Sequence, residues 1–186
     1  MVQQINNIPF NVSFILNSYF SIYYVSYPQL ASEMQLTRGH ERPEEVADDT
    51  MNAMLANKYL AEGQTERAVP IFEALAADGA QRVPALYALL VCHAVQLRCR
   101  DVSETVHRIL TASPVLDTDR IRQYGRRFSA EFIVGLRARL GDLCRHADSR
   151  ATACNRMVLA ELLEDETEAA RCRRLIGEME PEWNIR

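Results

Sequence analysis

Cysteine and histidine are the residue types in this chain that could bind a metal or act as a nucleophile. Cys144, His146 and Cys154 lie close together in the sequence, and thiolate and imidazole groups are the ligands that zinc prefers. A closed zinc site needs four ligands in tetrahedral geometry, and the neighbouring sequence offers no convincing fourth. We therefore expect no metal and no other cofactor.

Catalysis has little support in the sequence. Cys92 and His93 are adjacent, and consecutive helical residues project about 100° apart, so they cannot form a nucleophile and base without other groups. The chain has no GxSxG motif, and its seven glycines are too scattered for a phosphate-binding loop. The acidic run 161–168 is typical of a solvated helix end. We expect a protein that is not an enzyme, and an enzyme of unknown class remains an alternative.

Charge and cysteine usage restrict the partners and the compartment. The net charge of −4 is spread over both signs, so nothing resembles the clustered basic surface that nucleic acid requires. Arg122, Arg126 and Arg127 have helical spacing and indicate a solvated face. The five cysteines are an odd number and form no CxxC pair, which favours a reducing, cytoplasmic location.

Residues 1–37 form an aromatic-rich N-terminal extension that is uncharged up to Glu33. A membrane span is not expected, because Asn and Ser residues interrupt the apolar window 8–27. A cleaved signal is also disfavoured, since no Lys or Arg precedes Arg38. The extension could be an ordered strand or helix that covers the core, or upstream sequence before a natural start at Met34.

Residues 38–48 read as a polar linker, and helices follow over 49–183. Gly63 and Asp78-Gly79 mark helix ends in the first part of this region. We expect two helices within 117–149 that meet near Ser129 or Gly135. The other expected helices are 50–62, 65–77, 84–97, 102–112, 151–163 and 166–178.

Two windows of 34 residues, 49–82 and 83–116, share one helix-turn-helix register. The first places Leu55, Ala56, Tyr59, Gly63, Ala68 and Phe72 at repeat positions 7, 8, 11, 15, 20 and 24. The second places Leu86, Leu89, Leu90, Val102, Val106, Ile109 and Pro114 at positions 4, 7, 8, 20, 24, 27 and 32. The window 150–183 recovers Ala160, Ala169, Ile176 and Pro181 at positions 11, 20, 27 and 32.

This register resembles the tetratricopeptide repeat family. The resemblance implies an all-α fold, a short right-handed α-solenoid of antiparallel helix pairs. The second window departs from the family at Leu90 and Val102, where small residues are preferred, and at Leu97, where the turn glycine is replaced. That departure puts the turn geometry of the second unit in question.

The resemblance also implies a concave groove lined by the first helix of each pair. Family members that bind a terminal carboxylate use a lysine where this chain has Ala53, so a carboxylate clamp is not expected. The candidate groove residues for an apolar peptide are Asn57, Leu60, Tyr87, Val91 and Val95. On this interpretation, replacing Tyr87 or Val91 weakens partner binding and leaves the fold intact. Alternatively, several of these residues are core or contact the N-terminal extension.

The expected function is therefore a protein-interaction scaffold or a chaperone that binds an apolar peptide segment of another protein. Size and groove character are similar to those of bacterial type III secretion chaperones, which hold translocator proteins. Homodimerisation is an alternative, since the sequence ends in a segment that contains Trp183 and Ile185. We expect neither nucleic acid nor membrane as a partner.

Overall fold

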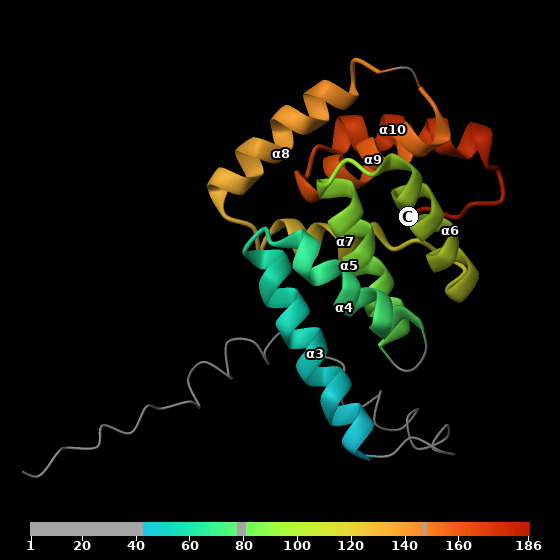
Figure 1. Cartoon of the computed structure of the whole chain (residues 1–186). Helices are drawn as coiled ribbons and strands as arrows, with labels where there is room; N and C mark the ends of the chain where they lie inside the picture. The colour runs from blue at the N-terminus through green and yellow to red at the C-terminus, as the bar shows by residue number, and fades with distance from the viewer. Residues whose placement is uncertain (1–42, 78–80, 147) are drawn as a thin grey trace, which may run out of the picture. The chain divides into compact units, whose positions relative to one another are not determined.

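The computed structural model describes residues 43–186 except 78–80 and 147, with backbone alone for 43–48 (Figure 1). Every regular element in this part of the chain is a helix, which confirms the all-α expectation. The expectations for residues 1–37 lie outside the described residues. The helices are α3 (Pro43–Ala61), α4 (Thr65–Ala77), α5 (Arg82–Val95), α6 (Cys99–Ala112), α7 (Thr118–Gly125), α8 (Ala130–Leu143), α9 (Arg150–Leu162) and α10 (Glu166–Met179).

Most helix limits agree with the expected ones, and the first helix is the main exception. Helix α3 begins at Pro43 instead of Thr50, so the expected linker 38–48 overlaps it. Proline suits the first turn of a helix because its φ is already helical and its missing N–H has no partner there. None of the described helices is long and apolar enough to cross a membrane.

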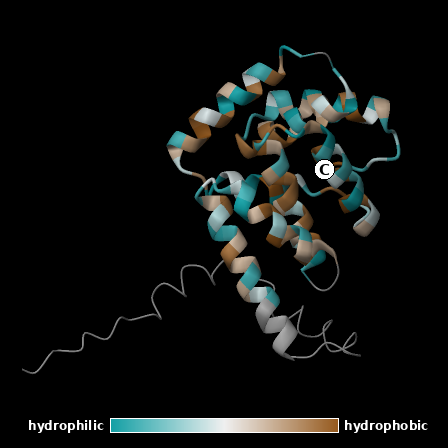
Figure 2. Cartoon of the chain, viewed as in Figure 1, coloured by the Kyte–Doolittle hydropathy of each residue, from teal (hydrophilic) through white to brown (hydrophobic). Residues whose placement is uncertain are grey.

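Two helices, α5 and α9, are surrounded by the others. Helix α5 packs against α4, α6, α7 and α9, and α9 packs against α5, α6, α7, α8 and α10. All residues of 85–95 and of 153–162 are buried, and hydrophobic residues gather along α5 in Figure 2. A helix that is apolar on every side, as α5 is, has to be enclosed by its neighbours. Helix α9 is equally enclosed although it also buries polar and charged residues, so these two helices form the centre of the core.

Three hairpins, α3–α4, α5–α6 and α9–α10, share one turn at repeat position 15. Gly63, Leu97 and Glu164 all have a positive φ, at 74°, 59° and 54°. In each turn the next residue donates its backbone N–H to the carbonyl five residues earlier, at 2.8–2.9 Å (Gln64 to Tyr59, Arg98 to His93, Asp165 to Ala160). This bond pattern closes a helix C-terminus. The replacement of glycine by Leu97 therefore leaves the turn geometry unchanged.

The third hairpin, α7–α8, is built differently. Its helices meet at Ser129, as expected, where the Ser129 hydroxyl accepts the Phe132 N–H at 3.2 Å. Helix α7 lies so close to α9 that a Cβ added to Gly125 would stand 2.1 Å from the Leu162 carbonyl oxygen. In a regular array each repeat contacts its neighbours alone, whereas here α9 packs directly on α5 and α6. The third hairpin thus does not separate the second from the fourth.

The C-terminal residues 183–186 pack on the linker between α6 and α7. Leu116 and Ile185 form a parallel bridge, and the Leu116 N–H donates to the Asn184 carbonyl at 2.8 Å. The Trp183 ring stacks on His107 with ring centres 6.3 Å apart. Trp183 and Ile185, on which the dimer alternative was based, are therefore half-buried against the core.

The shared turn predicts that glycine is favoured at two equivalent positions, 63 and 164. Gly63→Ala should lower the free energy of unfolding by about 1–2 kcal/mol, because its φ is positive and its Cβ would lie 3.0 Å from the Phe132 ring. Glu164→Gly should be more stable than Glu164→Ala by about 0.5–1 kcal/mol, since glycine alone relieves the strain. Urea unfolding of the three variants checks this, and equal stability of the two Glu164 variants would contradict it.

Candidate functional site

Four of the five expected groove residues lie in the core. Leu60, Tyr87, Val91 and Val95 are at most 3% exposed. The fifth, Asn57, is half-buried, and its Nδ2 donates to the Ala53 carbonyl at 2.8 Å. Leu60 lies on α3, and the other three lie on α5, which packs against α4, α6, α7 and α9.

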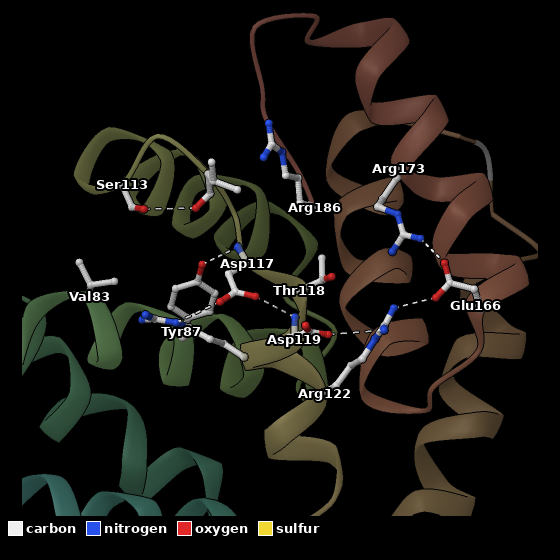
Figure 3. Close-up of a pocket in the computed structure, with 12 residues that line it drawn as sticks. Val83, Tyr87, Ser113, Asp117, Thr118, Asp119, Arg122, Glu166, Arg173 and Arg186 are labelled. Carbon is white, nitrogen blue, oxygen red and sulfur yellow. Dashed lines mark hydrogen bonds and ion pairs between the residues drawn. The ribbon is translucent and has the colours of Figure 1, made fainter. Parts of the chain in front are cut away.

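An open cleft lies beside the beginning of α5 (Figure 3). We call it the α7–α10 cleft, and its volume is about 710 Å³. Tyr87 is the one expected groove residue that reaches it. The cleft is lined by residues of α5, the α6–α7 linker, α7, α10 and the C-terminal tail, namely Val83, Tyr87, Ser113, Val115, Asp117, Thr118, Asp119, Arg120, Arg122, Glu166, Arg173 and Arg186.

Two arginines of the cleft lining, Arg122 and Arg173, are bound by a buried carboxylate. The Glu161 side chain, on α9, is 0% exposed and accepts from Arg122 Nε at 2.7 Å. Arg173, from α10, binds the other oxygen of Glu161. A buried carboxylate is costly unless it is paired and hydrogen-bonded. Glu161 therefore fixes the position of both guanidinium groups.

The same two arginines also bind a second, exposed carboxylate. Glu166, in the first turn of α10, is 62% exposed and accepts from Arg122 Nη2 at 2.7 Å. Its other oxygen is bound by Arg173, and Figure 3 shows Glu166 between the two guanidinium groups. Both arginines lower the pKa of Glu166, with the Arg173 hydrogen bond as the largest cause. The carboxylate is thus charged at neutral pH.

Another part of the cleft lining is organised by Tyr87. Its hydroxyl oxygen accepts the Asp117 backbone N–H at 2.7 Å, and the Arg120 guanidinium lies 5.3 Å from the ring centre. Arg120 is also paired with Asp117 at 3.4 Å. Desolvation is the main reason that the pKa of Tyr87 is raised. Tyr87 therefore ties the α6–α7 linker to α5.

The thiols and the buried histidine are poorly suited to nucleophilic chemistry. Burial raises the pKa of Cys92, Cys154 and Cys172 to about 12, so these thiols stay protonated at neutral pH. His93 is buried in α5, and its Nδ1 has no hydrogen-bond partner among the described residues. Within the same part of the chain, no group of three or more His, Cys, Asp or Glu residues is placed to hold a metal ion.

The α7–α10 cleft does not follow from the sequence patterns, because its arginines come from separate segments of the chain and the run 161–168 is typical of a solvated helix end. One signal was present: Glu161 follows Cys154 and Met157 at helical spacing, which places it on the apolar face of its helix. A carboxylate on such a face needs cationic partners from neighbouring helices.

Comparison with known proteins does not assign the chain to a family. No protein-family model, no curated protein and no solved structure matches it.

The burial of α5 predicts that Val91→Asp unfolds the protein instead of selectively weakening a binding site. Val91 is 0% exposed, so an aspartate there would be a buried, unpaired charge, which typically costs more than about 3 kcal/mol. Val134→Asp is the control, because Val134 on α8 is 67% exposed. Circular dichroism and thermal melting check this. A folded Val91→Asp protein with an unchanged melting temperature would contradict this prediction and support Val91 as a groove residue.

His93 predicts a loss of stability in mildly acidic solution. Burial is the main cause of its lowered pKa, opposed by Asp101 and Glu73. Below the ordinary pKa of 6.5, the unfolded chain takes up a proton more readily than the folded one. The free energy of unfolding therefore decreases as the pH is lowered. Urea unfolding at about pH 7.5 and pH 5 should show a smaller loss for His93→Gln than for the wild type. Exposed His146→Gln should behave as the wild type, and an equal loss in all three proteins would refute the assignment.

Proposed function

We propose that the chain is a tetratricopeptide-like protein-interaction module, a scaffold or chaperone that binds a peptide segment of another protein. The observation that carries this proposal is the α7–α10 cleft, which is open and has two valines and four arginines among its lining residues. Val83 and Val115 are half-buried in its lining. Apolar side chains and fixed hydrogen-bond donors are what a peptide-binding site combines.

The recurring turn supports the tetratricopeptide-like description. Gly63, Leu97 and Glu164 occupy the same repeat position with the same backbone conformation. We propose that the α3–α4, α5–α6 and α9–α10 hairpins form a short right-handed solenoid and that α7–α8 is inserted between the last two. The contact of α9 with α5 and α6 supports this arrangement. It places the peptide site beside the inserted α7 instead of on the concave face of α5.

We infer a reducing, cytoplasmic setting for this module. All five cysteines lie among the described residues, and none is in a disulfide. Secreted domains of modest size more often rely on disulfides.

A peptide-display screen on the full chain tests the proposed function. The wild type should enrich peptides from a random library, and Val83→Arg should bind the enriched peptides at least about tenfold more weakly, a difference of about 1.4 kcal/mol. An arginine at Val83 narrows the cleft at the beginning of α5. Val134→Arg is the matched control, because this exposed valine lies on α8, outside the cleft lining.

Two results would contradict the proposal. The first is that the immobilised protein enriches no peptide from the library relative to a surface that carries no protein. The second is equal binding of the enriched peptides by Val83→Arg and Val134→Arg, which would place binding outside the cleft.

A further inference from the structure

We infer that Arg122 and Arg173 form a binding site for an acidic side chain of a partner peptide, and that Glu166 occupies this site in the free protein. The inference rests on the proposed function, because it names the partner chemistry of the same cleft. Its basis is that buried Glu161 and exposed Glu166 each bind both guanidinium groups. Arg122 is also paired with the exposed Asp119 at 3.5 Å, but among these three carboxylates Asp119 is the one without a contact to Arg173.

The two carboxylates differ in how readily they can leave. Glu161 is enclosed at 0% exposed, and removing it would leave both arginines without their inner partner. Glu166 is 62% exposed, so its side chain can rotate into solvent and regain hydration. Ion pairs of exposed groups contribute little net stability. Glu166 is therefore the exchangeable ligand of the two arginines.

The geometry suits a carboxylate in particular. Glu166 gives one oxygen to Arg122 and the other to Arg173, so the two guanidinium groups are already spaced for the two oxygens of one carboxylate. Such charge-assisted pairs are directional as well as strong. Because Glu161 holds both arginines, an incoming carboxylate would not have to order them, which reduces the entropic cost of binding.

The rest of the cleft extends this site along a peptide. Arg186 lines the cleft, and it has no ion pair with any residue in the described part of the chain; its Nε donates to Asn184 at 3.2 Å. The apolar side chains of Val83 and Val115 line the same cleft. An acidic residue next to an apolar residue is therefore the peptide chemistry that the cleft favours.

Nuclear magnetic resonance of the full chain with two small probes tests the inference. The probes are N-acetylglutamic acid α-amide, which carries a carboxylate on its side chain alone, and its glutamine counterpart, which is neutral. The glutamate probe should shift the side-chain Nε–Hε signals of Arg122 and Arg173. Glu166→Gln should bind this probe about tenfold more tightly than the wild type, because the internal competitor is weakened, which corresponds to about 1.4 kcal/mol.

Glu180→Gln is the matched control. Glu180 is also paired with an arginine, since it accepts from Arg150 at 2.6 Å, and it is not among the residues that line the cleft. Its replacement should leave the affinity for the glutamate probe unchanged. Glu166→Ala should reproduce the gain of Glu166→Gln and shows that the gain does not depend on the new amide.

Three results would overturn the inference: equal affinity of Glu166→Gln and the wild type, equal binding of both probes, or no shift of the two arginine signals. The display screen separates this failure from failure of the proposed function. Enriched peptides that bind in the cleft but lack acidic residues would refute the carboxylate site and leave peptide binding intact. Tight binding of the glutamate probe without any enriched peptide would support the carboxylate site and refute the peptide function.

Discussion

The structure depends on the neutralisation of two charged residues that α9 carries into the interior. Glu161 is held by Arg122 and Arg173, and Arg156, at 1% exposed, is held by Glu168 at 2.9 Å and Asp148 at 2.5 Å. Removing one member of such a buried pair typically costs about 3–5 kcal/mol, since the other charge is left unpaired. The positions of α7 and α10 around α9 are therefore coupled to these ion pairs, and the cleft between them is a consequence of the core.

The hairpin units could be predicted from the sequence because local signals mark their ends. The 65–77 helix has both limits as expected. Ser129 is the N-cap of α8, because its side chain accepts the backbone N–H of Phe132. The beginning of α3 at Pro43 was missed, because charged and polar residues before Thr50 read equally well as a linker. A run of charged and polar residues lacks the apolar spacing on which such predictions depend.

The candidate site could not be predicted in the same way. A repeat position indicates which face of α5 meets another helix, but it does not say whether a later hairpin will cover that face. Val91 and Val95 are buried because α5 is enclosed on all sides, and this packing depends on residues far along the chain. Leu97 shows the reverse case, since it adopts a backbone conformation that its own residue type disfavours.

The pairing of the C-terminal tail with the α6–α7 linker has a practical consequence for labelling. Arg186 accepts the Thr118 N–H at 2.7 Å and donates its own to Leu116 at 3.0 Å, so the last residue of the printed sequence is anchored in the lining of the cleft. A fluorophore or fusion partner joined after Arg186 would emerge beside the candidate site. Such a label would report on occupancy of the cleft, and a bulky one would obstruct it.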